Sequence, residues 1–222
     1  SDTYLSEKDG SPVVLKLYRK GVRPNEELLK KIRDLTQRHP GNLVRLLDYG
    51  EDDGWFYEVS EYCALGSLSV ILKARTKLSE KLRGKEGLLF LARQVHDALR
   101  VLHENGIYHR DLKPANILFR NEDNAVLSDF GIAREVEAST IYTEGFKGTH
   151  TYTAPEVFAD KITKTSDYFS LGIILYEVYF AKHPFKGLSR EAVLATLLSS
   201  VGEPVSVPDE GDDDALLLLR GL

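Results

Sequence analysis

A short stretch near the middle of the chain carries an acid, a lysine and an asparagine at fixed offsets. Asp111 can accept a proton, Lys113 can neutralise negative charge, and Asn116 offers an amide oxygen to a hard cation. A second acid, Asp129, follows the next predicted hairpin. Phosphoryl transfer from a nucleotide depends on positioning, on charge neutralisation and on a divalent cation with oxygen ligands. These residue types therefore suit the transfer of a phosphoryl group to a hydroxyl.

Three motifs place these residues in a recognisable order. Residues 109–116 read HRDLKPAN, Asp129 opens the triplet Asp-Phe-Gly, and residues 154–156 read Ala-Pro-Glu. The set resembles the catalytic loop, metal-binding triplet and Ala-Pro-Glu element of eukaryotic-type protein kinases. A lone aspartate is more often a cap or a turn residue, but here four roles fall at the family spacing. The lysine at position 113 is typical of the serine/threonine branch.

The resemblance implies a role for each of these side chains. Asp111 would orient the attacking hydroxyl and accept its proton, and Lys113 would neutralise the moving phosphoryl group. Asn116 and Asp129 would hold Mg²⁺. His109 and Phe130 would pack in the core as structural residues, and Asp167 would hold the backbone of the catalytic loop.

Lys16 resembles the strand lysine that binds the α- and β-phosphates of ATP in this family, although an edge lysine that points to water is the plainer interpretation. Its partner should be a glutamate on the following helix, where Glu26 and Glu27 are available and Glu27 is our choice. The apolar stripe of that helix puts neither glutamate squarely at the expected turn. A solvent-facing pair of glutamates therefore stays an open alternative.

The segment that would join two lobes contains Glu61 and Cys63, and its backbone would contact the adenine of ATP if the resemblance holds. Ser60 would be the gatekeeper next to that contact. Cys63 itself has no local charge that would favour a thiolate, so we expect a small, half-buried apolar residue.

Periodicity predicts a small sheet with one helix followed by mainly helical segments, and the resemblance implies that these form an α+β protein with a two-lobed, kinase-like fold. Residues 1–62 would form an N-lobe with a small antiparallel sheet and one helix, and residues 63–222 a mainly helical C-lobe. The predicted strands cover residues 13–18, 43–50, 55–62, 116–119 and 125–127, with a short strand near residue 4. The predicted helices cover residues 24–37, 68–73, 86–105, 170–180, 190–200 and 215–222. Residues 74–85 read as a charged, solvated connection.

The resemblance covers nearly the whole chain, but the chain does not supply every part of the family fold. No segment matches the Gly-rich loop Gly-x-Gly-x-x-Gly, and the last predicted helix stops at residue 222. We therefore expect an N-lobe that lacks the first strand and the Gly-rich loop, and a C-lobe that lacks the last helices.

Composition limits the partners and the cellular location that we expect for this protein. A net charge of −5 argues against a nucleic-acid partner. The single cysteine excludes an intrachain disulfide and fits a reducing compartment. The longest apolar run, residues 171–181, is shorter than the roughly 20 residues that span a bilayer. With no signal peptide at the N-terminus, a cytoplasmic protein without a membrane partner is the expectation.

The resemblance implies an ATP- and Mg²⁺-dependent kinase that acts on Ser/Thr hydroxyls of protein substrates. Arg110 is typical of kinases controlled by phosphorylation of the activation segment, in which Thr143 is a leading candidate; a homodimer could phosphorylate that segment in trans. Ser67 and Ala115 occupy positions where arginine-directed kinases carry glutamate, so little preference for upstream arginine is expected. A pseudokinase that only binds partners, and a small-molecule phosphotransferase, remain the alternatives.

Overall fold

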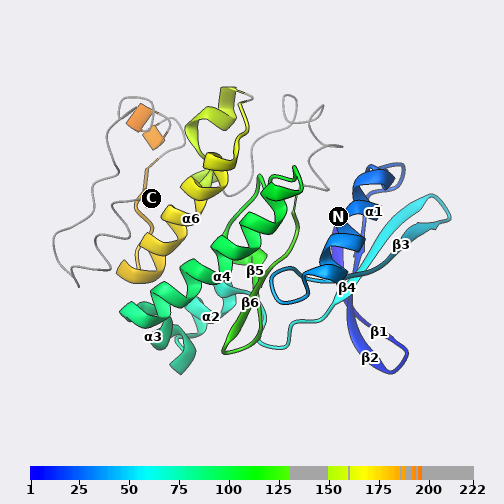
Figure 1. The fold of residues 1–222 in the computed structure, drawn as a ribbon, viewed down its shortest axis with the longest axis horizontal. Coiled ribbons are helices and arrows are strands. Elements are labelled where there is room, and N and C mark those ends of the chain that lie inside the picture. Colours follow the sequence, from blue (N-terminus) through cyan, green and yellow to red (C-terminus); the bar gives the residue numbers. More distant parts are fainter. Residues whose placement is uncertain (131–149, 160, 186, 189–191, 194, 197–222) are drawn as a thin grey trace.

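The computed structural model describes residues 1–130, 150–159, 161–185, 187–188, 192–193 and 195–196. A small sheet with one helix lies at one end of the molecule, and the longer helices lie beside one another in the remainder (Figure 1). This is the two-lobed α+β arrangement that the sequence predicts. The helices predicted at 190–200 and 215–222, and the candidate phosphosite Thr143, lie wholly or mostly outside the described residues.

The N-terminal sheet contains four antiparallel strands in the order β1-β2-β4-β3. Its strands are β1 (Asp2–Lys8), β2 (Ser11–Leu17), β3 (Leu46–Asp52) and β4 (Trp55–Glu61). Asp9 and Gly10, which join the first two strands, both have positive φ, at 52° and 73°. A tight hairpin turn needs that backbone conformation, and Gly and Asp adopt it most readily. The predicted hairpin and strand pair are therefore confirmed.

Helix α1 (Glu26–Arg38) covers this sheet. Asn25 is its N-cap, and its side chain accepts a hydrogen bond from the Leu28 backbone N–H. Such a cap satisfies one of the backbone donors that the first helical turn leaves open. The apolar stripe directs Leu29, Ile32 and Leu35 into the core. The two glutamates of the first turn, Glu26 and Glu27, are exposed.

Within the described residues, four helices build most of the second lobe. They are α2 (Leu68–Ala74), α3 (Lys77–Arg83), α4 (Lys85–Glu104) and α6 (Lys164–Phe180). Helices α4 and α6 run side by side through its centre (Figure 1). Helix α6 begins six residues before the predicted start, at the Thr163 capping box. The expectation that this segment is buried is confirmed, because Leu171, Ile174 and Leu175 are at most 2% exposed.

The prediction of a solvated connection at residues 74–85 was wrong, because helix α3 lies there. Its charged residues face solvent, but Leu78 and Leu82 are buried at 6% and 1% exposure. The two leucines are four residues apart and share one helix face, which packs on the core. Thr76 caps the helix through its side-chain oxygen, which accepts a hydrogen bond from Ser79 N–H. A seven-residue helix with only two apolar positions gives little periodic signal.

A two-stranded sheet, β5 (Ile117–Asn121) and β6 (Asn124–Leu127), follows the catalytic-loop motif and connects to the N-terminal lobe. Val44 N–H donates to Leu127 C=O at 2.8 Å, and Leu127 N–H donates to Asn42 C=O at 3.0 Å. Asp129, which opens the Asp-Phe-Gly triplet, thus follows two residues after a strand that is hydrogen-bonded to both lobes.

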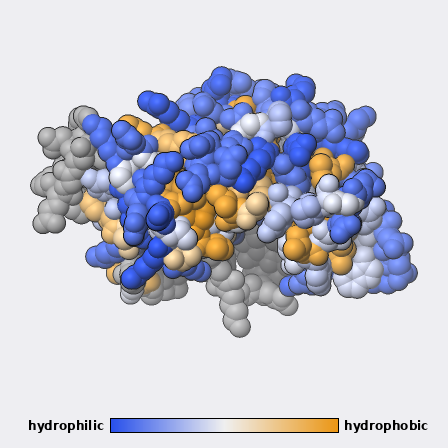
Figure 2. All heavy atoms as spheres, turned by 90° about the horizontal axis from the view of Figure 1, so that it is seen from below, coloured by the Kyte–Doolittle hydropathy of each residue, from blue (hydrophilic) through white to orange (hydrophobic). Residues whose placement is uncertain are grey.

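Hydrophilic residues cover most of the face in Figure 2, and hydrophobic residues show between them in several patches. Within the described ranges, no helix combines the length and apolar character needed to cross a bilayer. The apolar residues of α6 are instead part of the protein core.

Candidate active site

A carboxylate on α6 holds the backbone of the catalytic-loop motif through hydrogen bonds. Asp167 accepts hydrogen bonds from the backbone N–H groups of His109 and Arg110, both at 2.9 Å. The ring Nε2 of His103, on α4, is 2.8 Å from the same carboxylate. Burial acts to raise the pKa of Asp167, but the hydrogen bonds from His103 and from the loop backbone outweigh it and leave the pKa lowered. An ionised Asp167 therefore anchors the loop, as the resemblance implies.

This anchor holds Arg110 in a backbone conformation with φ of 66°. A non-glycine residue in this region carries strain, and such strain persists only where the surroundings determine the conformation. The two backbone hydrogen bonds to Asp167 hold Arg110 in this conformation. The turn aims Asp111, the next residue, at the space between the lobes.

His109 is a core residue in this structure. Its side chain is fully buried, and its ring meets that of Phe130 edge-on at 6.5 Å. Burial lowers its pKa, so the imidazole is neutral. Neither ring nitrogen has a hydrogen-bond partner among the described residues, so the histidine is less well satisfied than expected. A neutral ring enclosed in the core cannot serve as the base of a reaction at the cleft.

Asp111, Lys113 and Asn116 converge on one point. Lys113 Nζ is 2.7 Å from Asp111 Oδ2, and Asn116 Nδ2 is 2.8 Å from the Asp111 carbonyl oxygen and 3.4 Å from Oδ2. The 3-10 turn Pro114–Asn116 folds the chain back and allows these contacts. The structure thus brings together an acceptor for a hydroxyl proton and a cation that can neutralise charge.

Asp129 lies near this cluster, because the charge of Lys113 acts on its carboxylate and the neighbouring Ser128 is hydrogen-bonded to Asn116. Its backbone φ is 55°, and its Oδ1 is 2.6 Å from Lys16 Nζ on β2. The side chain is half exposed. Desolvation in the cleft acts to raise its pKa, but the charge and hydrogen bond of Lys16 dominate and leave the pKa lowered. Asp129 is accordingly an ionised, accessible carboxylate.

The two proposed metal ligands lie next to each other along a shared backbone contact. Ser128, the neighbour of Asp129, donates its N–H to the Asn116 carbonyl at 2.9 Å. Because the Asn116 side-chain nitrogen is bonded to Asp111, its Oδ1 is the atom left for a cation. One carboxylate and one amide oxygen fit Mg²⁺, which uses few protein ligands and takes the rest from phosphates and water. The donor set is thus compatible with the expected metal.

The predicted ion pair between Lys16 and Glu27 is not formed. Glu27 is exposed in the first turn of α1, and Lys16 is instead paired with Asp129. The N-cap at Asn25 sets the phase of the helix and directs Leu29 and Ile32 inward, so Glu27 faces water. This was the open alternative in the sequence, and here it is the observed one.

Glu61 and Cys63 lie where the chain passes between the lobes, but the Glu61 side chain points into the protein. It accepts hydrogen bonds from the Arg45 backbone N–H at 2.7 Å and from Arg45 Nε at 3.2 Å, and it forms an ion pair with Arg120 on β5. Cys63 is 4% exposed, and burial raises the pKa of its thiol to about 11. Any contact that this segment makes with adenine therefore falls to its backbone.

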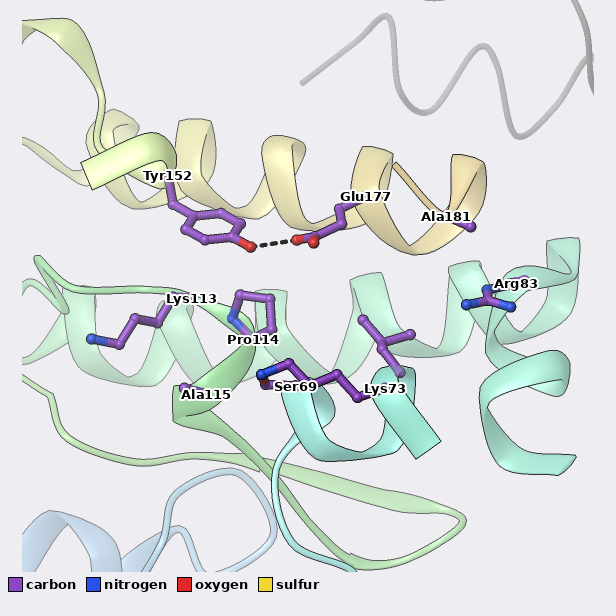
Figure 3. Close-up of a pocket in the computed structure, with 10 residues that line it drawn as sticks. Ser69, Lys73, Arg83, Lys113, Pro114, Ala115, Tyr152, Glu177 and Ala181 are labelled. Atoms are coloured by element: carbon purple, nitrogen blue, oxygen red, sulfur yellow. Dashed lines mark hydrogen bonds between the residues drawn. The ribbon is translucent and has the colours of Figure 1, made fainter. Parts of the chain in front are cut away.

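A cavity of about 430 Å³ opens below the catalytic loop (Figure 3). Lys113, Pro114 and Ala115 line it from the loop, and the remaining residues come mainly from α2 and α6. The Tyr152 hydroxyl donates a hydrogen bond to the Glu177 carboxylate along the α6 side of this cavity, opposite the catalytic-loop residues. The cavity therefore adjoins the proposed catalytic residues through Lys113.

The Ala-Pro-Glu element is tied to the start of α6. Glu156 Oε1 accepts a hydrogen bond from Ser166 Oγ at 2.7 Å, and Ser170 Oγ donates to the Tyr152 carbonyl at 2.7 Å. These contacts fix the segment that carries Tyr152 on the helix that also holds the catalytic loop.

Two residues important to this geometry were missed in the sequence. Glu58 on β4 is a carboxylate at 8% exposure directly opposite Lys16, and Arg120 links Glu61 to the loop before β3. A charged residue in a strand that otherwise alternates toward the core is a signal that could have marked Glu58. Arg120 gave no such signal, because its partners are distant in sequence.

Comparison with known proteins agrees with this geometry. The sequence model of the protein kinase domain matches residues 3–215. The chain is 34% identical over 96% of its length to the serine/threonine-protein kinase TIO of Arabidopsis thaliana, and 34% identical over 82% to the serine/threonine-protein kinase PrkC of Bacillus subtilis. It is 28% identical over its full length to a putative serine/threonine-protein kinase A of Trypanosoma brucei brucei.

The chain spans only part of each relative: 16% of the Arabidopsis protein, 28% of the Bacillus protein and 53% of the trypanosome protein. The family match nevertheless covers nearly all of the chain, and the motif residues occupy the site just described. The chain belongs to the protein kinase domain family, among relatives that are serine/threonine-protein kinases.

Proposed function

We propose that this domain transfers the γ-phosphoryl group of Mg²⁺-bound ATP to serine or threonine hydroxyls of protein substrates. The observation that carries the proposal is a set of contacts among five side chains from three parts of the chain. Lys113 and Asn116 contact Asp111, Lys16 contacts Asp129, and a backbone hydrogen bond from Ser128 to Asn116 links the two groups. Each is of the type that the reaction needs, and the 2.6 and 2.7 Å contacts place cations and carboxylates side by side.

Within this site Asp111 orients the acceptor hydroxyl and takes its proton. Lys113, already within hydrogen-bond distance of Asp111, neutralises charge on the transferring group. Asn116 and Asp129 would hold Mg²⁺, which supplies charge neutralisation for the phosphates. Lys16 would contact the nucleotide phosphates, and the backbone near Glu61 and Cys63 the adenine.

The cavity below the catalytic loop is our candidate for the substrate segment that precedes the target hydroxyl. Its lining carries the cationic residues Lys73, Arg83 and Lys113, against the single carboxylate of Glu177, which Tyr152 already contacts. An incoming arginine would find little uncompensated negative charge there. We therefore expect weak or no preference for upstream arginine, and a peptide library should show it. Strong enrichment of arginine just before the target residue would contradict this assignment.

The rival functions differ in what they transfer and to what. A pseudokinase would bind nucleotide without turnover, and the presence of Asp111, Lys113, Asn116 and Asp129 together disfavours it. A small-molecule phosphotransferase would not need the Ala-Pro-Glu segment that α6 holds in place. The experiment is to offer labelled ATP and Mg²⁺ with either a casein-type protein or small alcohols. Label on protein supports the proposal, whereas label only on the alcohols supports the second rival.

Regulation, assembly and location are parts of the same proposal. We expect phosphorylation in residues 131–149, with Thr143 as a leading candidate and a homodimer acting in trans. The single cysteine fits a reducing, cytoplasmic setting. Mass spectrometry of the active protein tests the modification, and fully active protein without phosphate in this segment would exclude that form of control.

A further inference from the structure

A buried carboxylate faces Lys16 from the neighbouring strand. Glu58 on β4 is the register partner of Lys16 on β2, and it is only 8% exposed. Register partners in antiparallel strands project to the same face of the sheet and lie close together. Tyr18, two residues after Lys16 and therefore on that same face, is 4% exposed. Three polar side chains thus share one face of the sheet beside the proposed nucleotide site.

Tyr18 holds this group together. Its hydroxyl donates a hydrogen bond to Glu58 Oε1, and Lys16 Nζ lies 5.6 Å from the centre of its ring. A cation at that distance from an aromatic face is attracted to it. Tyr18 therefore contacts both the carboxylate and the ammonium group, and it orients one toward the other.

The charge of Lys16 also compensates Glu58. Burial is the largest effect and leaves the pKa of Glu58 raised, while the Lys16 charge and the Tyr18 hydroxyl act to lower it. A buried carboxylate without a cation nearby would be costly, and the described part of the N-lobe places Lys16 directly opposite. The helix glutamate expected in this role, Glu27, is exposed to solvent instead.

In this structure Lys16 Nζ is 2.6 Å from Asp129, which is one of the two proposed metal ligands. A metal ion held by Asp129 would share its carboxylate oxygens and would weaken its contact with Lys16. A second carboxylate beside Lys16 would then help to keep its ammonium group directed at the phosphates. Glu58 is the carboxylate on the same sheet face.

We propose that Glu58 on β4, held by Tyr18, is the positioning residue that orients Lys16 toward the nucleotide phosphates, in place of a glutamate on α1. This inference rests on the proposed function, because it assumes that Lys16 contacts phosphate. It assigns no chemical step to Glu58, which acts only through Lys16.

The test measures binding by calorimetry, with Mg·ADP and with adenosine, on the full chain and on Glu58→Gln. The glutamine keeps the shape and removes the charge. We expect about tenfold weaker binding of Mg·ADP, the size of one charge-assisted contact. Adenosine, which has no phosphate, should bind within about twofold of wild type. Glu27→Gln is the matched control and should change neither affinity.

Each other outcome overturns the inference. Unchanged Mg·ADP binding in a folded Glu58→Gln protein would show that Lys16 does not need this carboxylate, and equal losses for both ligands would reduce Glu58 to a packing role. A loss in Glu27→Gln would return the role to α1. If Glu58→Gln does not fold, Tyr18→Phe decides: it should weaken Mg·ADP about threefold without affecting adenosine, and an unchanged affinity contradicts the proposal. Failure of wild type to bind Mg·ADP would instead refute the proposed function.

Discussion

Arg120 connects the two lobes, and its removal should be among the most destabilising changes in the chain. Its guanidinium forms an ion pair with Glu61 at the end of β4 and donates to the Leu43 carbonyl at 3.0 Å and to Asn124 Oδ1 at 2.9 Å. It also donates to the Pro40 carbonyl. Arg120→Ala deletes all of these contacts together.

The size of the destabilisation follows from the Glu61 carboxylate, which loses its Arg120 partner. Glu61 is 9% exposed, so it would be left as a buried carboxylate with only Arg45 as a partner. Removing one member of a buried ion pair typically costs about 3–5 kcal/mol. Because Arg45 still compensates part of the charge, we expect the lower end, about 3 kcal/mol. In a chain of this size each kcal/mol lowers Tm by about 2–4 °C, so Tm should fall by about 6–12 °C.

Urea denaturation of wild type and Arg120→Ala measures this free energy, with Arg100→Ala as the control. Arg100 forms an exposed i,i+4 pair with Glu104, so its loss should cost less than about 0.5 kcal/mol. An Arg120→Ala protein within about 1 kcal/mol of wild type would refute the reasoning, since the burial of Glu61 would then carry no energetic consequence.

The same pair gives a pH dependence. Burial acts to raise the pKa of Glu61, but Arg120 and the Arg45 contacts outweigh it and leave the pKa lowered. A carboxyl with a lowered folded-state pKa stabilises the protein above its unfolded value of about 4.3 and loses this contribution as the pH falls through the folded value. The stability difference between wild type and Arg120→Ala should therefore be largest near neutral pH and narrow below about pH 4.

Three further predictions concern other parts of the site and its support. A Cβ at Gly87 in α4 would lie 2.1 Å from the Lys81 carbonyl oxygen, so Gly87→Ala should destabilise the protein by more than about 2 kcal/mol, within the range of about 1–3 kcal/mol that is usual for overpacking, although alanine has the better helix propensity. Gly106 has a φ of 68° and open space around it, so Gly106→Ala should cost only about 1 kcal/mol. Urea titrations of the two variants test this difference. Cys63 should resist iodoacetamide at pH 8 in native protein, because its thiol pKa is about 11, and react fully in denaturant; fast native labelling would contradict its burial. Asp167→Ala should reduce kcat by at least about tenfold and destabilise by about 2–5 kcal/mol, because two backbone N–H groups lose their acceptor; kinetics with a denaturation curve test both effects.

Much of this architecture could be predicted because short motifs, turn residues and apolar patterns within single segments indicate it. The HRDLKPAN and Asp-Phe-Gly motifs predict Asp111, Lys113, Asn116 and Asp129 as site residues. In the structure the first three contact one another, and Asp129 pairs with the strand residue Lys16. The hairpin of β1 and β2 was predictable from its turn residues and alternation. The strong apolar pattern of α4 and α6 likewise fixed the centre of the second lobe.

What escaped prediction depends on partners far apart in the sequence. The phase of α1 is set by the Asn25 cap, and with this phase Glu27 faces solvent. Glu58 gains its place only because β4 pairs with β2, and Arg120 because β5 packs against the loop before β3. Such pairings are properties of the packed fold, whereas propensity and periodicity report on one segment at a time.

The most direct test of the central claim is a single-turnover reaction of the full chain with γ-labelled ATP and Mg²⁺ on a protein substrate, beside Asp111→Asn and Lys16→Ala. The account predicts label on serine or threonine with wild type. Asp111→Asn should transfer less label by about a thousandfold or more while it still binds nucleotide, and Lys16→Ala should bind and transfer poorly. Equal transfer by wild type and Asp111→Asn would contradict the account, since the hydroxyl would then react without the carboxylate at the centre of this site.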